Sequence, residues 1–239
     1  MTLSPDPVVR DLQIMAPAVR YPRWIYTQFR GVLGRRVLEC GAGIGNFTRF
    51  LTDREVVLAV DSYGPCVEQL KVRFADQPNI VPLQLDISSP DLLALESYHL
   101  DTIVCVNVLE HVADDQGTLT RLHEILQPGG YLALLVPAFQ FLYGSIDEVI
   151  GHYRRYNTRE LREKLGKAQF HLLDLFYMNC IAPAAWFLNN RILKRREESS
   201  AQVLIFDRWV VPWLSQLERV IRPPFGLSAI AIARKDGPR

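Results

Sequence analysis

The chain has 239 residues, 49% of them hydrophobic, and a formal net charge of +1. This length and apolar content are enough to bury one full domain core, and the balanced charge gives no electrostatic footprint for nucleic acid. No apolar run reaches the ~20 residues that span a bilayer, and the N-terminal stretch lacks the pattern of a signal peptide, so we expect a protein that is neither secreted nor integral to a membrane.

The cysteines and histidines show no metal-binding spacing. The four cysteines form no C-x-x-C pair, and two of them lie in apolar runs, so we expect reduced core residues in a cytoplasmic protein. The five histidines are spread along the chain: His99, His111, His123, His152 and His171. The sequence therefore predicts no metal site.

Residues 1–34 combine four prolines with a later group of aromatic side chains. We expect them to form a helical cap before the first strand, and residues 35–239 to form the main domain. Tyr26 and Phe29 are expected to cover one face of the core. Tyr21 is the better candidate for contact with a ligand.

A short apolar run and three glycines follow the cap. The run at residues 37–40 contains Glu39 and is followed by Gly41, Gly43 and Gly45. This pattern predicts a buried strand, a tight turn and the start of a helix, because glycine permits positive φ and close approach of backbone to a ligand. The Glu39 carboxylate would then lie beside exposed amide groups at a helix N-terminus, an arrangement that suits a zwitterionic ligand.

The glycine spacing separates two classes of cofactor. In the dinucleotide fingerprint G-x-G-x-x-G the third glycine lies five residues after the first, whereas here Asn46 occupies that position. Glu39 would also repel a pyrophosphate at close range and attract an ammonium group. The turn therefore favours S-adenosylmethionine over NAD, and an NAD-dependent oxidoreductase is the weaker alternative.

Two further apolar runs end in a carboxylate. One covers residues 55–61 and ends at Asp61, and the other covers residues 80–86 and ends at Asp86. Such runs predict strands that are buried on both faces of a parallel sheet. Asp61 lies 20 residues after Gly41, where a charged acceptor can take hydrogen bonds from ribose hydroxyls.

Strand and helix then continue to alternate. Residues 101–107 predict a fourth strand, which leads into Leu109, Glu110 and His111, and a helix follows. Pro128 and the glycines after it end that helix before a fifth strand. The alternation predicts an α/β fold with a doubly wound, mostly parallel seven-stranded sheet, whose ligands bind at the carboxyl ends of the strands.

The residues of this region resemble the class I S-adenosylmethionine-dependent methyltransferases, over roughly residues 21–176. Residues 38–45 are similar to the first motif of that family. Asn107 with the Leu-Glu-His sequence that ends at His111 resembles the fourth motif, and residues 126–130 resemble the hairpin before the fifth strand. The resemblance implies a Rossmann-like methyltransferase fold with S-adenosylmethionine as its cofactor.

The resemblance also implies how the cofactor is held. The glycine backbone and Glu39 would face its methionine moiety, which Asn107 also approaches. Asp61 would bind the ribose, and Asp86 would meet the adenine amino group. The cofactor-binding residues predicted in this way, together with the aromatic candidate of the cap, are Tyr21, Glu39, Gly41, Ala42, Gly43, Asp61, Ser62, Asp86, Ile87 and Asn107.

A polar and aromatic segment follows the fifth strand at residues 151–157. Asn157 and Glu160 predict an N-terminal cap for a helix over residues 158–166, which explains part of the pattern. Capping does not explain the histidine, arginines and tyrosine, and arginine can recognise an anionic or hydroxylated acceptor. Pairing of the arginines with preceding acidic residues is the alternative. The predicted catalytic residues are His111, His152, Arg154 and Tyr156.

Methyl transfer is an in-line displacement at an activated carbon, so the protein mainly has to align donor and acceptor and, where needed, remove a proton. His111 and His152 are the candidate bases, because imidazoles titrate near neutrality. We expect O- or N-methylation, rather than C-methylation, of a small-molecule or lipid-like acceptor. The alternative from another class is a non-catalytic S-adenosylmethionine-binding module that holds a protein partner.

A helical insertion at residues 180–226 is expected between strands at 168–178 and 227–235. It holds three of the four tryptophans and a basic group at residues 191–196. Its second half carries an apolar stripe at helical spacing, formed by Val210, Leu214, Leu217 and Ile221. The stripe requires a burial partner, for which four alternatives stay open: the protein's own sheet, a second subunit, an apolar acceptor, or a membrane surface in peripheral contact.

Overall fold

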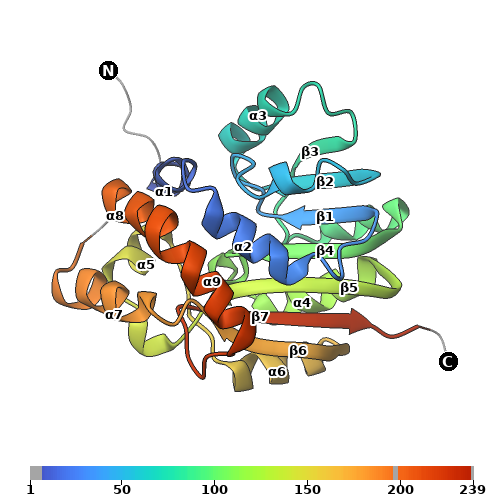
Figure 1. Ribbon diagram of the computed structural model, residues 1–239. Helices are drawn as coiled ribbons and strands as arrows, with labels where there is room; N and C mark the ends of the chain where they lie inside the picture. Colours follow the sequence, from blue (N-terminus) through green and yellow to red (C-terminus); the bar gives the residue numbers. More distant parts are fainter. Residues whose placement is uncertain (1–6, 196–198, 238–239) are drawn as a thin grey trace.

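The computed structural model describes residues 7–195 and 199–237. Its centre is a seven-stranded sheet in the order β3-β2-β1-β4-β5-β7-β6 (Figure 1). The strands are β1 (Arg36–Cys40), β2 (Val56–Asp61), β3 (Ile80–Gln84), β4 (Leu100–Val106), β5 (Leu126–Pro137), β6 (Phe170–Met178) and β7 (Ser228–Lys235). Among these strands only β7 runs antiparallel to its neighbours, so the predicted mostly parallel sheet is confirmed.

Helices cover both faces of the sheet. They are α1 (Pro7–Met15), α2 (Arg20–Phe29), α3 (Gly64–Arg73), α4 (Asp115–Ile125), α5 (Ser145–Ile150), α6 (Thr158–Lys167), α7 (Ala182–Phe187), α8 (Ser200–Ile205) and α9 (Val211–Val220). In Figure 1, α2 and α9 lie in front of the sheet, and α4 and α6 lie behind it. Each layer has its own apolar core, with Phe29 and Leu214 buried in one and Leu119 and Leu161 in the other.

The α-helix expected directly after the glycine turn does not form. Gly41, Gly43 and Gly45 all have positive φ, which lies outside the right-handed helical region. The chain makes only a short 3-10 turn at Thr48–Phe50 before β2. The exposed amide groups of this region therefore belong to a looped turn and not to a helix N-terminus.

The expected ends of the neighbouring elements are close to those observed. Asp61 is the last residue of β2, whereas β3 ends at Gln84, so Asp86 lies in the loop after it. The Asn157 side chain accepts a hydrogen bond of 2.9 Å from the Glu160 amide at the start of α6. The predicted cap of that helix is thus confirmed.

The insertion forms two helical segments. The first joins α7 to a π-helical turn at Leu188–Ile192, and the second joins α8 and α9 through another π-helical turn at Phe206–Val210. Of the predicted stripe, Leu214 is buried, but 46% of Leu217 and 63% of Ile221 are exposed. The protein's own core therefore buries only part of the stripe, and the partner that would cover Leu217 and Ile221 stays open.

Two carboxylates dock the insertion onto the rest of the protein. Asp207 accepts hydrogen bonds from the amides of Val19, Arg20 and Tyr21, at 3.2, 3.2 and 2.7 Å, and so caps α2 from another part of the chain. The Glu218 carboxylate accepts hydrogen bonds from the amides of Asn179 and Cys180, the two residues that follow β6. The insertion is therefore fixed against both the N-terminal helices and the sheet.

No helix among the described residues combines the length and the apolar character needed to cross a bilayer. The basic group expected at residues 191–196 is described as far as Arg195, and Arg196 lies outside the described residues.

Candidate functional site

A cavity of about 1050 Å³ opens at the carboxyl ends of the parallel strands. Its floor is the glycine turn after β1 and the loops after β2, β3 and β4. The ten residues that the sequence predicts as cofactor contacts all line it: Tyr21, Glu39, Gly41, Ala42, Gly43, Asp61, Ser62, Asp86, Ile87 and Asn107. The structure thus brings the whole predicted set to one cavity, while their individual roles in binding stay predictions.

Glu39 is a buried carboxylate at the floor of this cavity. Its Oε2 atom is buried and has no hydrogen-bond partner among the described residues. Burial raises the pKa of Glu39 to about 8, and the negative charge of Asp61 adds to this shift. Such a group gains most from a cationic ligand, because only a positive charge compensates the cost of burying the carboxylate.

The other two acidic residues are held by backbone amides. Asp61 accepts hydrogen bonds from the Gly43 amide at 2.8 Å and from the Tyr63 amide at 2.9 Å. Asp86 accepts from both the amide and the hydroxyl of Ser88, each at 2.8 Å. These contacts fix the carboxylates at the cavity rim, as expected for acceptors that recognise ligand hydroxyl and amino groups.

These residues fit the cofactor that the motif resemblance implies. S-adenosylmethionine carries an ammonium group, which the unpartnered oxygen of Glu39 can accept. Gly41 and Gly43 have positive φ, and a side chain on Gly41 would collide with Val108. The turn therefore requires glycine for its own geometry and leaves its backbone open to the cavity.

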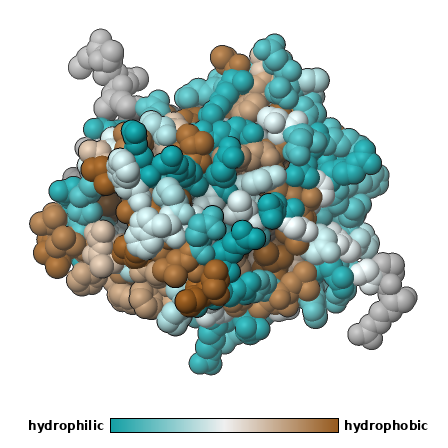
Figure 2. All heavy atoms as spheres, in the orientation of Figure 1, coloured by the Kyte–Doolittle hydropathy of each residue, from teal (hydrophilic) through white to brown (hydrophobic). Residues whose placement is uncertain are grey.

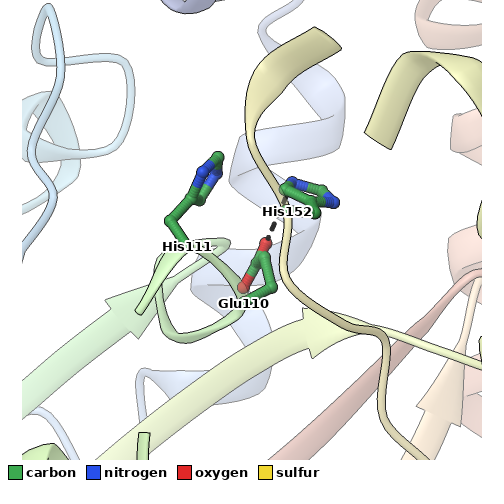
Figure 3. A group of neighbouring side chains, drawn as sticks. All are labelled: Glu110, His111 and His152. Atoms are coloured by element: carbon green, nitrogen blue, oxygen red, sulfur yellow. Dashed lines mark ion pairs between the residues drawn. The ribbon is translucent and has the colours of Figure 1, made fainter. Parts of the chain in front are cut away.

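A second cluster lies in the same cavity, where the loop after β4 meets the segment between α5 and α6. Figure 3 shows Glu110, His111 and His152 converging from these two elements. One ligand atom of each lies within 4.8 Å of the others, and the two imidazole rings are 4.5 Å apart at a nearly perpendicular angle of 83°. The His152 Nε2 atom is 3.8 Å from the Glu110 Oε1 atom.

Glu110 is fully buried, and neither of its carboxylate oxygens meets a donor from another described residue. Burial raises its pKa to about 8. The pKa of His111 is lowered to about 4 by burial and by the neighbouring His152, so its imidazole is neutral at physiological pH. The cluster therefore combines a neutral His111 imidazole with a buried carboxyl group that no other described residue hydrogen-bonds.

Asp147 holds the cluster in place from behind. Its Oδ1 atom is 2.7 Å from His152 Nδ1 and accepts a hydrogen bond of 2.8 Å from Arg155. Its Oδ2 atom accepts from Asn190 of the insertion at 2.9 Å and from the Gly144 amide at 3.0 Å. With all these partners Asp147 stays ionised, and its hydrogen bond with His152 leaves Nε2 facing Glu110.

Two of the four predicted catalytic residues do not line the cavity. Arg154 pairs with Asp115 at 2.8 Å and donates to the Ala113 carbonyl, and the Tyr156 hydroxyl donates to Asp115 at 2.9 Å. Tyr156 is fully buried in the core. Because these contacts occupy both side chains, we do not assign either residue to the reaction. His111 and His152 both line the cavity.

Three residues of the site were not among the predicted ones: Glu110, Asp147 and Arg155. Glu110 was visible inside the Leu-Glu-His motif, but a buried and unpartnered carboxylate cannot be distinguished from an ordinary one in a sequence. The pairing of Asp147 with Arg155 was anticipated as an alternative for the arginines. The contact of Asp147 with His152 depends on the turn after α5, which no sequence pattern revealed.

The insertion forms the remaining wall of the cavity. Its contribution is mostly apolar and comes from α7, α8 and the π turn before α9: Ile181, Ala182, Ala185, Trp186, Val203, Ile205, Phe206 and Val210. Trp186 is held by a hydrogen bond to the Leu142 carbonyl and by the Arg155 guanidinium, 4.7 Å above its ring. The glycine turn and the carboxylates thus form the polar end of the cavity, and the wall from the insertion is mostly apolar but also includes Asn189, Ser199 and Gln202.

Comparison with known proteins identifies related chains. A family model described as a methyltransferase domain matches residues 19–175. The ubiquinone biosynthesis O-methyltransferase of Nitrosospira multiformis is 29% identical over 101 residues, which cover 41% of each chain. A highly reducing polyketide synthase of Strobilurus tenacellus is 32% identical over 108 residues, 42% of this chain and 4% of that protein. The chain spans between 4% and 47% of the length of the curated relatives compared here.

Solved structures with the same fold cover nearly the whole chain. A possible histamine N-methyltransferase of Thermotoga maritima has a TM-score of 0.64 at 16% identity, covering 97% of this chain and 98% of that one. The putative methyltransferase in the complex with the Haloferax volcanii Trm112 activator has the same TM-score and identity, with 95% and 94% covered. At this identity the likeness concerns the fold alone.

Proposed function

Because the chain belongs to the methyltransferase-domain family, within the class I S-adenosylmethionine-dependent methyltransferases, we propose that it methylates a hydroxyl group of a lipid-like acceptor. The observation that carries this proposal is that one cavity is lined by a glycine turn with its carboxylates, by a cluster of two imidazoles and a buried carboxyl group, and by apolar residues of the insertion. Each part corresponds to one requirement of the reaction.

The polar end is proposed to hold the cofactor. Glu39 would take the ammonium group, Asp61 the ribose hydroxyls and Asp86 the adenine amino group. Bound S-adenosylmethionine supplies a methyl group that is already activated by a sulfonium. The protein then has to place the acceptor in line and to keep water away, and the buried walls of the cavity support both tasks.

Proton removal is proposed to take place at the second cluster. A hydroxyl must lose its proton when its oxygen is methylated, and His111 and His152 are the two bases at the cavity wall. His111 is neutral because burial lowers its pKa to about 4, and Asp147 orients His152 by a hydrogen bond to Nδ1. A thioether acceptor would become a sulfonium without losing a proton and would not need a base, so the cluster favours an acceptor that loses a proton, for which we propose a hydroxyl group.

The acceptor is proposed to be lipid-like because of the wall that the insertion supplies. Apolar residues of α7 and α8 line the cavity, and further apolar residues continue on the outside: Phe187, Leu188, Ile192, Leu193, Leu204 and Ile205. Exposed apolar surface of this kind marks a binding site for a partner or a membrane. An acceptor with a long apolar part could thus extend from the cavity along the insertion.

The proposal is tested by profiling lipids and metabolites of cells with and without the protein. We expect species that carry one methyl group on oxygen to vanish from the organic-phase extract when the protein is absent, and their unmethylated forms to accumulate. Restoring the wild-type chain should return the methylated species, whereas a Glu39→Gln chain should not. Loss of only water-soluble or carbon-methylated species would contradict the proposed acceptor.

A further inference from the structure

The cluster formed by Glu110, His111 and His152 has a composition that the proposed function does not require. A single base would be enough to remove a proton, yet the structure gathers two imidazoles and a carboxylate around one point (Figure 3). The carboxylate is fully buried without a hydrogen-bond partner from another described residue. A buried carboxyl group of this kind carries its charge only when a positive group compensates it.

From this geometry we propose that Glu110, His111 and His152 bind a divalent first-row transition metal ion. Two imidazole nitrogens and one carboxylate oxygen form a donor set that binds ions such as Zn²⁺, Fe²⁺ or Co²⁺. The absence of ligand spacing in the sequence is no obstacle, because the fold supplies His152 from a loop 41 residues after His111. The prediction of no metal site rested on spacing alone.

The supporting contacts agree with a metal site. A histidine that binds a metal usually donates its second ring N–H to a carboxylate or a backbone carbonyl, which fixes the tautomer. His152 has this contact through Nδ1 with Asp147, at 2.7 Å, and the His111 ring has it with the backbone of Ile150. In both cases that contact leaves the other ring nitrogen available as a metal ligand.

The distances are close to those that a metal ion would need. Metal–ligand bonds of about 2.1 Å place neighbouring ligand atoms roughly 3 to 3.5 Å apart. Here the ligand atoms lie within 4.8 Å of one another, with 3.8 Å between His152 Nε2 and Glu110 Oε1. Small rotations of the side chains would bring the three into the ligand shell.

The charges around the cluster also allow a cation. The nearest positive group is the Arg155 guanidinium, which Asp147 neutralises at 2.8 Å. No arginine or lysine among the described residues lies at ion-pair distance from Glu110, so a bound divalent ion would supply the positive charge that favours its ionised form. His111 and His152 both line the cavity, so the remaining coordination positions of the ion would face the acceptor end.

This inference deepens the proposed function and depends on it only for the acceptor step. An acceptor hydroxyl on the ion would lose its proton to water, with the O–H electron pair remaining on oxygen, because a divalent ion lowers the pKa of a bound hydroxyl. That oxygen then forms the bond to the methyl carbon, while the electron pair of the carbon–sulfur bond goes to sulfur. With the ion bound, both histidines act as ligands and neither acts as the base.

The inference is tested by titrating chelator-treated full-length protein with Co²⁺ and following its visible absorption. We expect one equivalent to bind, and Glu110→Gln and His111→Gln to weaken binding at least about 100-fold. His171→Gln is the matched control, because His171 is exposed on β6 outside the cavity, and it should bind as the wild type does. Equal Co²⁺ affinity in the wild type and in Glu110→Gln would overturn the site.

Two further measurements keep the result interpretable. Thermal unfolding without metal should show that Glu110→Gln is about as stable as the wild type, because glutamine has nearly the same shape as the buried carboxyl group and carries no charge, so lost binding cannot be ascribed to unfolding. S-adenosylmethionine binding is measured on the same samples. If the protein binds S-adenosylmethionine but not Co²⁺, the metal site is contradicted and the proposed function is not. If it binds Co²⁺ but not S-adenosylmethionine, the proposed function is contradicted and the metal site is not.

Discussion

Two buried carboxylates govern the chemistry of the cavity at the scale of single residues. Glu39 and Glu110 lie in the same cavity, and burial raises the pKa of each to about 8. Neither is compensated by an arginine or lysine at ion-pair distance among the described residues. Each therefore favours a positively charged partner, which we assign as the cofactor ammonium group for Glu39 and a divalent ion for Glu110.

The raised pKa of Glu39 predicts a proton release on cofactor binding. Near pH 7 most of the empty protein carries a protonated Glu39, and an ammonium group in contact with it favours the carboxylate. Calorimetry of S-adenosylmethionine binding in two buffers of different ionisation enthalpy should show release of up to about one proton. Glu39→Gln should bind more weakly and release none. Equal heats in both buffers for the wild type would exclude this contact.

The same shift has a consequence for stability. The pKa of Glu39 is raised from 4.5 in the unfolded chain to about 8 in the folded one, so the folded state binds more protons between these values. Stability of the empty protein should therefore fall as pH rises through this window, and Glu39→Gln should reduce the fall. Unfolding midpoints measured at several pH values test whether stability falls in this window. Glu68→Gln, at an exposed residue, is the control.

Asp61 supports a prediction about affinity. Replacing it with alanine should weaken S-adenosylmethionine binding by roughly 1.5–3 kcal/mol, the range for hydrogen bonds to a charged group. Asp61→Ala also frees the Gly43 amide that it holds. Asp76→Ala, on an exposed residue of the following helix-to-strand loop, is the matched control. An unchanged dissociation constant for Asp61→Ala would remove Asp61 from the binding site.

The sequence revealed most of the cofactor end and little of the acceptor end, for a physical reason. Glu39, Asp61 and Asp86 lie at or just after the carboxyl ends of consecutive strands of one sheet, so local pattern and sheet topology together bring them to one edge. His152 reaches His111 only through the conformation of a loop, and the docking of Arg154 and Tyr156 onto Asp115 depends on long-range packing. Such contacts leave no periodic signal in the chain.

At the scale of elements, the glycine turn determines where the cofactor end lies. Three positive-φ glycines keep the chain out of a helix after β1, and the turn is held against β2 by the Asp61 carboxylate and by a hydrogen bond between the Ala42 amide and the Val60 carbonyl. The sequence pattern predicted the turn correctly, but it also predicted a helix directly after the turn, and that helix does not form. Periodicity also missed the π turn at Phe206–Val210, directly before α9.

Gly43→Val is expected to abolish S-adenosylmethionine binding and to leave the protein folded. A valine at φ +55° is strained by about 1–3 kcal/mol, and its Cβ would meet the Leu12 side chain of α1. Gly31→Val is the matched control, since Gly31 has open space around it and no positive φ. Equilibrium dialysis combined with circular dichroism checks both parts. Wild-type affinity in Gly43→Val would contradict the placement of the cofactor at this turn.

At the scale of the whole molecule, the second helical segment of the insertion has two different apolar sides. Val211 and Leu214 are buried against the protein, whereas Ile205, Trp209, Trp213, Leu217 and Val220 form an exposed stripe at helical spacing. Figure 2 shows hydrophobic surface around α7 and the lower part of α9. Exposed arginines of the same helix, Arg208 and Arg219, flank the stripe.

We expect this stripe to bind a membrane that carries anionic lipid. Tryptophans and basic residues on one helix are typical of interfacial binding, and each basic residue near the surface adds about 1 kcal/mol that salt screens. Anionic vesicles should sediment the wild type at low salt and release it at high salt. Serine at both Trp209 and Trp213 should prevent sedimentation, whereas Val72→Ser, an 81% exposed residue of α3, should not. Concentration-dependent dimers without lipid binding would assign the stripe to a second subunit.

The measurement that tests the account most directly is methyl transfer itself. Purified protein is incubated with methyl-labelled S-adenosylmethionine and a lipid extract of cells that lack the protein, so that unmethylated acceptor is present. We predict S-adenosylhomocysteine formation in step with label that enters the organic phase, and neither product with Glu39→Gln. S-adenosylmethionine that binds but gives no S-adenosylhomocysteine with any extract, aqueous or organic, would contradict the assignment of this chain as a methyltransferase of lipid-like acceptors.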